Sequence, residues 1–567
     1  MNAIKIPVGR SGFADIREHG FYYVDKSLLV EEIVRMEGTQ VTLLTRPRRF
    51  GKTMAMSMLA EFFDIRKDSA GLFRGLAVSE RKELCRAWMN QYPTVFVSFR
   101  GVDGLDFQGA YAELVSVAAD VCKEHLYLLE SDKVNSFDKE LFRGLAAEKA
   151  SLSDVKKTLV ILTRMMYAHY GKPVILLMDE YDVPLAKASA KGYYEQMLDV
   201  VRGMMSVLKD NRALKFAVVT GCLRIAKESV FTGTNNLVSD TIADTRFMEY
   251  FGFTQAEVDR LLADTGLEAY GDRMKEWYDG YSFGEMDVYC PWDVTNYVSD
   301  LLVNQKASPK GYWNNSSDNA IVRSFIEYAG DEVTKKLEIL LAGGTIMQQI
   351  RDDLTYDYLH SSLENLWSIL YLTGYLTRDR KALLPESESK LTPLKIPNRE
   401  VLEIYETTIA AWFMESSRGM DRKKLFSAVW MGDSETVTEE MNRLLRRTIS
   451  YHDYREDFYH AFFAGIFAGA RYAVESNREH GEGRSDITVQ DYAGDRAAVF
   501  EVKYASTREG LEAGCQAALA QIDEKRYAGE FEDDYAKVLC YGIAFYKKRC
   551  LVRRKGEPFS ASVLSGK

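Results

Sequence analysis

The chain has 567 residues, which is too long for one hydrophobic core and predicts three or four domains. Its composition is that of a globular protein, with 46% hydrophobic and 28% charged residues. The net charge of −10 argues against a protein that coats nucleic acid over its whole surface, although a local basic groove stays open. No apolar run is long enough to cross a membrane, and the first residues lack the apolar core of a signal peptide, so neither feature is expected.

The seven cysteines include no C-x-x-C pair. Cys122 and His125 have a ligand-like spacing, but no second pair accompanies them. This pattern argues against a structural zinc site and predicts a reducing compartment, the cytoplasm.

The first predicted helix runs from Leu28 to Met36. Asp25 and Ser27 precede it, and both are residue types that cap helix N-termini. Two aromatic residues, Tyr22 and Tyr23, lie just upstream and belong either to the core or to the binding surface of a ligand.

Residues 46–53, RPRRFGKT, are the central motif of the N-terminal half. An apolar, β-branched run at 41–44 predicts a buried strand before them, and residues 54–60 favour a helix after them. A strand, a tight loop ending in Gly-Lys-Thr, and a helix are typical of a phosphate-binding loop. We therefore predict a nucleotide-binding α/β domain, in which Tyr22 or Tyr23 could stack on adenine.

Each residue of this loop has an expected role. Backbone N–H groups from Gly51 onward would hold the β-phosphate, Lys52 would neutralise the β- and γ-phosphates, and the Thr53 hydroxyl would bind Mg²⁺. Arg46 stands where such loops usually have glycine. We expect Arg46, Arg48 and Arg49 to bind the nucleotide by adding positive charge beside the phosphates. The alternatives are a chance Gly-Lys-Thr, or a loop that binds nucleotide without hydrolysing it.

A second motif follows an α/β alternation with a strand at 94–99 and helices near 111–126 and 152–170. The run at 173–178 is apolar throughout, as in a strand covered on both faces, and it ends in Asp179 and Glu180. Ligands of parallel sheets bind at the carboxyl ends of the strands. Asp179 is therefore predicted to hold Mg²⁺ through water, and Glu180 to polarise the attacking water.

Another apolar strand is predicted at 216–221. Thr220 at its end could sense the γ-phosphate, and Arg224 could reach it from the same chain or a neighbouring one; a surface salt bridge is the alternative for Arg224. Thr254 and Glu257 form a capping box that opens a helix, and the ATPase domain is predicted to end near residue 290.

Residues 291–450 are predicted to be a helical connector. A helix at 363–372 is followed by a charged hairpin, with strands at 375–377 and 391–396. Helix and hairpin together favour a winged-helix-like module. The hairpin carries charges of both signs, which favours packing between domains over DNA binding.

The last domain, 451–567, contains a second chemical motif. A predicted helix at 457–470 is followed by strands at 471–479, 485–490 and 497–504, a helix, and a strand at 537–545. The two-residue period of a strand places Glu501 and Lys503 on one face, and a hairpin could bring Asp486 beside them. Two carboxylates suit Mg²⁺ or Mn²⁺, and the lysine could orient the attacking water. This arrangement predicts metal-assisted phosphodiester hydrolysis, with a surface strand of alternating charges as the alternative.

The motifs YYVDKS, RPRRFGKT, LLMDEYD and TGCLRIAKESVFTGTNNL resemble a bacterial AAA-ATPase-like domain. GEGRSDI and FEVKY resemble the PD-(D/E)XK nuclease superfamily domain that commonly follows it, although Ser485 replaces the usual proline. The resemblance implies that Arg46 is the family's own variant. It also implies roles for Lys52 and Thr53 at phosphate and Mg²⁺, for Asp179 and Glu180, and for a nuclease centre of Asp486, Glu501 and Lys503.

The sequence leaves two functions open. One is an ATP-gated nuclease acting on DNA or RNA; by analogy, such pairs suggest a role in defence against phages or mobile elements. The other is a nucleotide-dependent switch whose nuclease fold binds nucleic acid or protein without cleaving. No membrane partner is expected, and both a homo-oligomer and a monomer fit the sequence.

Overall fold

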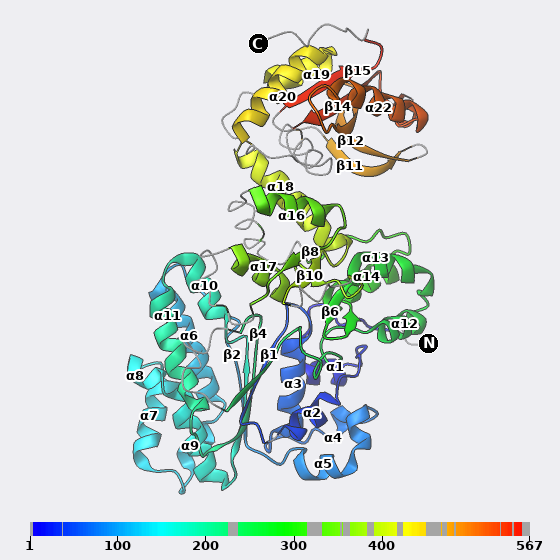
Figure 1. Cartoon of the computed structure of the whole chain (residues 1–567). Helices are drawn as coiled ribbons and strands as arrows, with labels where there is room; N and C mark the ends of the chain where they lie inside the picture. Colours follow the sequence, from blue (N-terminus) through cyan, green and yellow to red (C-terminus); the bar gives the residue numbers. More distant parts are fainter. Residues whose placement is uncertain are drawn as a thin grey trace. The chain divides into compact units, whose positions relative to one another are not determined.

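The computed structural model describes residues 4–36, 38–224, 236–313, 322, 331–351, 354, 363–382, 390–416, 423–448, 467, 473–480, 483–532, 534–546 and 549–557. They divide into an N-terminal unit, Met1–Ser316 with Met347–Glu400, and a C-terminal unit, Ser317–Ile346 with Val401–Lys567. Figure 1 shows both units as mixtures of helices and strands. The predicted domain boundaries near residues 290 and 450 stay predictions. Within the described residues, every helix is too short or too polar to span a bilayer.

The N-terminal unit is built on a parallel sheet with the strand order β2-β3-β4-β1-β5. The predicted strands at 41–44, 94–99, 173–178 and 216–221 are confirmed within one or two residues. Their side chains are almost all buried because helices cover both faces, as the apolar runs indicated. The strands are β1 (Val41–Thr45), β2 (Thr94–Ser98), β3 (Val174–Asp179), β4 (Leu214–Gly221) and β5 (Leu237–Asp240).

Helix α3 (Lys52–Phe63) packs on one face of this sheet against β2 and β3. Figure 1 places α1, α2, α4 and α5 on the same side as α3, with α6 to α11 on the other side. The helices of the two layers are α1 (Phe13–Glu18), α2 (Leu29–Arg35), α4 (Ala70–Phe73), α5 (Lys82–Trp88), α6 (Phe107–Lys123), α7 (Ser136–Ala146), α8 (Leu152–Val155), α9 (Thr158–Tyr170), α10 (Val183–Lys191) and α11 (Tyr194–Met204).

The predicted capping of α2 by Asp25 or Ser27 is wrong. The helix begins without a side-chain cap, and the two residues bind another segment instead. Asp25 Oδ2 accepts the N–H of Ala77 at 2.7 Å, and Ser27 Oγ accepts the N–H of Val78 at 3.1 Å. The side-chain oxygens predicted to cap α2 therefore accept hydrogen bonds from a segment that is distant in the sequence.

A second group of helices completes the N-terminal unit. Thr254 and Glu257 form the predicted capping box at the start of α12 (Gln255–Thr265). Tyr278, Tyr297 and Val258 lie in a shared apolar cluster of this group. The remaining elements are α13 (Gly271–Tyr278), β6 (Tyr281–Phe283), β7 (Met286–Val288), α14 (Pro291–Val303), β8 (Ile346–Gln348), α17 (Leu363–Leu372), β9 (Thr377–Arg378) and β10 (Thr392–Lys395).

The predicted helix at 363–372 is α17, and the strands that follow it, β9 and β10, pair antiparallel. They form a three-stranded sheet in the order β8-β10-β9. The tip of the predicted hairpin, 383–389, lies outside the described residues. The winged-helix interpretation therefore stays a prediction.

The C-terminal unit contains a five-stranded sheet in the order β11-β12-β13-β14-β15. Only the β13–β14 pair is parallel; the other neighbours are antiparallel. Helix α22 packs on β13 and β14, and Gly542 allows this because a Cβ there would lie 2.5 Å from the Cys515 carbonyl oxygen. The sheet elements are β11 (Ala473–His480), β12 (Gly483–Asp491), β13 (Arg496–Tyr504), α22 (Leu511–Glu524), α23 (Gly529–Glu532), β14 (Lys537–Tyr546) and β15 (Arg549–Arg554).

Four further helices are α16 (Asp331–Leu341), α18 (Arg399–Ser416), α19 (Lys423–Met431) and α20 (Ser434–Thr448), the last of which packs on β15. The strands predicted in the last domain are confirmed. The predicted helix at 457–470 lies outside the described residues except for Phe467, which is helical and buried.

Candidate functional site

The loop between β1 and α3, which carries the RPRRFGKT motif, contains two residues with a left-handed backbone. Gly51 precedes α3 with φ 88°, a left-handed conformation that favours glycine, and Arg49 also has a positive φ of 72°. Lys52 is buried, and its Nζ donates hydrogen bonds to the carbonyl oxygens of Arg46 at 2.9 Å and Pro47 at 2.8 Å. The lysine is thus held against the loop that would surround the phosphates.

Three predicted residues meet beside this loop. The Thr53 hydroxyl donates to Asp179 Oδ2 at 2.8 Å, and the Thr220 hydroxyl donates to Asp179 Oδ1 at 2.7 Å. Strand β4 lies between β1 and β3, so Thr220 comes from the strand that separates the two motifs. Ser98 adds a longer contact to Oδ2, at 3.3 Å. The fully buried Asp179 carboxylate is thereby fixed by hydroxyl groups from three elements.

Glu180 directly follows β3 and lines the pocket beside the loop. Its φ of 53° is left-handed, a conformation that non-glycine residues adopt at a cost and often at functional sites. Burial raises the pKa of its carboxyl; nearby Lys52 opposes this shift, and the Asp179 carboxylate adds to it. Glu180 is therefore a carboxylate whose proton affinity exceeds that of an exposed glutamate.

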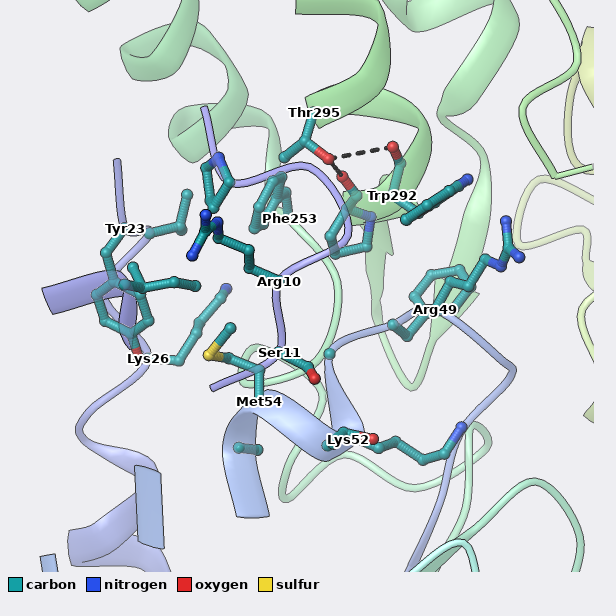
Figure 2. Close-up of a pocket in the computed structure, with 18 of the residues that line it drawn as sticks. Arg10, Ser11, Tyr23, Lys26, Arg49, Lys52, Met54, Phe253, Trp292 and Thr295 are labelled. Carbon is teal, nitrogen blue, oxygen red and sulfur yellow. Dashed lines mark hydrogen bonds between the residues drawn. The ribbon is translucent and has the colours of Figure 1, made fainter. Parts of the chain in front are cut away.

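A pocket of about 380 Å³ lies beside the loop. Its walls come from the N-terminal segment, from the loop with the start of α3, and from residues 250–295. Figure 2 shows Arg10, Phe253 and Trp292 around the same space as Lys52 and Met54. The lining residues include Arg10, Ser11, Tyr22, Tyr23, Lys26, Arg49, Gly51, Lys52, Thr53, Arg100, Glu180, Tyr250, Phe253, Trp292 and Thr295.

Arg46 is a correction to the predicted nucleotide-binding set. Its side chain is 0% exposed, and its Nη2 lies 2.6 Å from Asp240 Oδ1. The guanidinium also packs over the rings of Phe251 and Phe283, at 5.1 and 5.5 Å from their centroids. The Arg46 guanidinium thus lies in the core, where Asp240 supplies the carboxylate that a buried cation needs.

The other arginines differ in placement. Arg49 lines the pocket, and its guanidinium lies 4.5 Å from the ring centroid of Trp292. Burial lowers its pKa. Arg48 is exposed, and Arg224 is partly buried at the last described residue before the gap at 225–235. Of the three, Arg49 alone lines the pocket.

Tyr22 and Tyr23 both line the pocket, yet each has an intramolecular partner. The Tyr22 hydroxyl donates to Asp264 at 2.8 Å. The Tyr23 hydroxyl contacts Met58 Sδ at 3.4 Å, and its ring meets Phe13 edge-on at 5.3 Å. The two tyrosines therefore contact other side chains of the unit and line the pocket at the same time. Their stacking on a base stays a prediction.

Sequence reasoning missed the pocket wall formed by Lys26 and by residues 250–295. Lys26 Nζ donates to Glu257 Oε2 at 2.7 Å and to the Glu249 carbonyl oxygen at 2.6 Å. Glu257 also caps α12, so one carboxylate connects the N-terminal segment to that helix. The lysine of YYVDKS was the available signal, but its partner lies 231 residues away.

In the C-terminal unit, Glu501 and Lys503 lie on β13 and share a face as predicted. Lys503 Nζ donates to Glu501 Oε1 at 3.1 Å, and Glu501 is 0% exposed. Asp486 lies on β12, which pairs antiparallel with β13 through Ile487 opposite Phe500. The Asp486 side chain lies outside the described part, so the predicted convergence of the three groups stays a prediction.

Two basic residues near the end of the chain, Arg553 and Lys555, form ion pairs with acidic residues. Arg553 contacts Glu512 at 2.8 Å, and Lys555 contacts Asp523 at 2.5 Å. These pairs place the two cations beside acidic groups of α22.

Comparisons with known proteins agree with the two halves of this description. Residues 7–231 match the AAA-ATPase-like family, described as a predicted AAA-ATPase, and residues 454–555 match the PD-(D/E)XK nuclease superfamily. An uncharacterized protein from the vnfD 5′ region of Azotobacter chroococcum mcd 1 is 26% identical over 565 residues. The alignment covers 96% of this chain and 97% of that protein, so the similarity extends over nearly the full length of both chains. The chain therefore joins an N-terminal AAA-ATPase-like domain to a C-terminal PD-(D/E)XK nuclease superfamily domain.

Proposed function

We propose that the N-terminal unit binds and hydrolyses ATP and that its nucleotide state controls a metal-dependent nuclease centre in the C-terminal domain. The observation that carries the first half is the 2.8 Å contact between the Thr53 hydroxyl and the Asp179 carboxylate beside Lys52. Lys52 and Thr53 come from the first motif and line the pocket together with Glu180, which follows Asp179 in the second motif.

Each residue has a proposed task. Lys52 exchanges its contacts with the loop carbonyls for phosphate oxygens, and the loop N–H groups hold the β-phosphate. Glu180, whose pKa is raised by burial, orients the attacking water and takes up its proton. Arg49, which belongs to the loop and lines the pocket, adds positive charge there. Thr220 links Asp179 to the end of β4.

The Thr53 and Asp179 oxygens form a donor set that fits Mg²⁺, because this ion prefers hard oxygen ligands together with phosphate and water. When bound there, Mg²⁺ would neutralise charge on the phosphates. Thr53 would hold it directly, and Asp179 through water.

In the C-terminal domain, we propose that Asp486 and Glu501 hold Mg²⁺ or Mn²⁺ and that Lys503 positions the water that attacks a phosphodiester. The β12–β13 register supports this: one step beyond Ile487 opposite Phe500, Asp486 falls opposite Glu501. Lys503 is already within hydrogen-bonding distance of Glu501. A role in defence against phages or mobile elements rests on the resemblance alone.

The decisive experiment combines both activities. The full chain is incubated with Mn²⁺ and, in turn, single- and double-stranded DNA and RNA, with and without ATP, while phosphate release is followed. We expect ATP hydrolysis and cleavage of at least one nucleic acid at a rate that depends on ATP. ATP binding and metal binding without any cleavage would favour the alternative, a nucleotide-dependent switch whose nuclease fold is a binding module.

A further inference from the structure

Two residues that follow the second motif, Tyr181 and Asp182, bind the chain segment beyond β4. Asp182 Oδ2 accepts two backbone hydrogen bonds, from Cys222 N–H at 2.9 Å and from Leu223 N–H at 3.1 Å. The Tyr181 hydroxyl donates to the Leu223 carbonyl oxygen at 2.9 Å. One side chain thus holds the N–H groups of the segment, and the other holds a carbonyl.

The backbone supports the same arrangement. The left-handed conformation of Glu180 turns the chain, so that Tyr181 N–H donates to the Thr220 carbonyl oxygen at 3.2 Å. Tyr181 and Asp182 are both buried, at 0% and 2% exposure. Hydrogen bonds of this kind in a buried setting are costly to lose, because the freed groups stay without water.

Gly221 is the position that allows this close approach. A Cβ added there would lie 2.7 Å from Asp182 Oδ1 and 2.7 Å from a ring carbon of Tyr181. Both neighbours are buried and cannot move aside easily. The glycine at the end of β4 therefore belongs to the same arrangement as the two side chains.

The chain from Gly221 to Leu223, which Tyr181 and Asp182 bind, also contacts the RPRRFGKT motif. Cys222 Sγ lies 3.6 Å from Lys52 Nζ, and the Gly221 carbonyl oxygen accepts the N–H of Arg46 at 3.1 Å. The segment continues directly into Arg224. Its position thus depends on the second motif and bears on the phosphate loop.

We infer that Tyr181 and Asp182 are positioning residues for hydrolysis. They hold segment 222–224, which follows β4, against Lys52, and they thereby fix the backbone position of Arg224. This inference rests on the proposed ATPase function and assigns a task to the two residues that follow Asp179 and Glu180. Neither residue lines the pocket, so we expect their loss to affect hydrolysis more than the binding of ATP.

The test measures kcat and KM for ATP in full-length variants. Tyr181→Phe removes one hydrogen bond and should lower kcat about fivefold, with KM for ATP within about twofold of wild type. Asp182→Ala should lower kcat at least about tenfold with a similarly small change in KM. Asp182→Asn keeps an oxygen that accepts both N–H groups and should restore most of the rate. Gly221→Ala should resemble Asp182→Ala.

Matched controls separate positioning from general damage. Tyr193 also donates its hydroxyl to a backbone carbonyl, that of Gly104 at 3.0 Å, and Asp106 accepts the N–H of Gly109 at the start of α6. Tyr193→Phe and Asp106→Ala should leave kcat unchanged. Thermal melting identifies any variant that does not fold. If Asp182→Ala does not fold, the kcat of Tyr181→Phe tests the positioning role.

The possible results are distinct. A wild-type chain that binds ATP without hydrolysing it would overturn the proposed ATPase and the positioning role together. Wild-type hydrolysis with kcat unchanged in folded Tyr181→Phe and Asp182→Ala would overturn the positioning role alone. Equal losses of kcat in the Tyr193 and Asp106 controls would also overturn it, because the effect would then be one of stability.

Discussion

Arg46 Nη2 lies 2.6 Å from Asp240 Oδ1, and the two side chains are only 0% and 6% exposed. Burial lowers the pKa of Arg46 and raises that of Asp240, while the attraction between the two groups opposes both shifts. The pair joins the phosphate loop to the end of β5, at the sheet edge. An arginine in the position usually taken by glycine is thus a structural part of this loop.

Asp240→Ala should destabilise the N-terminal unit strongly, because it leaves a buried guanidinium without its carboxylate. We expect a loss of about 3–5 kcal/mol in the free energy of unfolding, measured by urea denaturation. Replacing both residues by apolar ones should recover much of that loss. Glu32→Gln, which breaks an exposed pair with Arg35, is the control and should have a much smaller effect. An equally small effect of Asp240→Ala would contradict the structural role of Arg46.

Lys52→Ala should weaken ATP binding at least tenfold, or roughly 1.4 kcal/mol, because it removes the loop cation that is proposed to bind the phosphates. Isothermal titration calorimetry with Mg²⁺ and ATP measures the change. Lys67→Ala, which removes a lysine paired with Glu61 outside the pocket lining, should leave the affinity unchanged. Unchanged affinity in a folded Lys52→Ala chain would show that the phosphates bind elsewhere.

Glu180→Gln should retain ATP binding and slow hydrolysis by about 10²-fold or more, because the amide cannot accept a proton from water. The raised pKa of Glu180 adds a pH signature: the charged, active form is lost as pH falls through that raised value. The wild-type kcat should therefore decline at a higher pH than an ordinary glutamate would cause. Glu113→Gln, on the exposed face of α6, serves as control. Hydrolysis at the wild-type rate in Glu180→Gln would remove this residue from the mechanism.

A buried carboxyl pair predicts a pH dependence of stability. Asp293 on α14 and Glu400 at the start of α18 are both 0% exposed, and Glu400 Oε1 accepts the N–H of Trp313 at 2.7 Å. Burial raises the pKa of both groups, and the nearby Asp293 carboxylate raises that of Glu400 further. The folded chain therefore keeps a proton that the unfolded chain releases above the ordinary carboxyl pKa.

The sign follows from this difference in bound protons. The contribution to stability is fully present below the ordinary pKa and is lost as pH rises through the raised folded values. Glu400→Gln keeps a hydrogen-bond donor without a titrating proton. Its urea midpoint should thus fall less than that of wild type between about pH 5 and about pH 9. Parallel pH profiles for the two chains would show that the pair does not hold a proton.

Asp486→Asn should abolish both metal-dependent stabilisation of the C-terminal domain and nuclease activity, since it removes one charge and one ligand. In wild type, Mg²⁺ or Mn²⁺ should raise the melting temperature by an amount that follows metal concentration over affinity. ATP binding should be unaffected, because its site is built from other residues. Asp534→Asn, an exposed acid of the same unit, should keep the metal response. Wild-type melting that ignores metal, with no cleavage, would leave only the fold assignment.

Local pattern alone predicted four of the five strands of the N-terminal sheet and the helix after Gly51; the edge strand β5 was not predicted. Apolar runs without polar alternation arise when both faces of a strand are covered, so 41–44 and 173–178 were recognisable as buried strands. The Gly-Lys-Thr motif was likewise sufficient to predict that Lys52 and Thr53 belong to the same site. The contact between Thr53 and Asp179, 126 residues further along, followed from the rule that parallel strands end at one edge.

Tertiary structure alone decided what Arg46 and Asp182 do. Arg46 pairs with a carboxylate 194 residues away, and Asp182 binds N–H groups 40 and 41 residues away. The pocket wall from Tyr250 to Thr295 likewise joins the phosphate loop only after the chain has folded back. These contacts depend on which buried groups still need a partner once the sheet has assembled, and a buried charge takes the nearest partner in space whatever its place in the sequence.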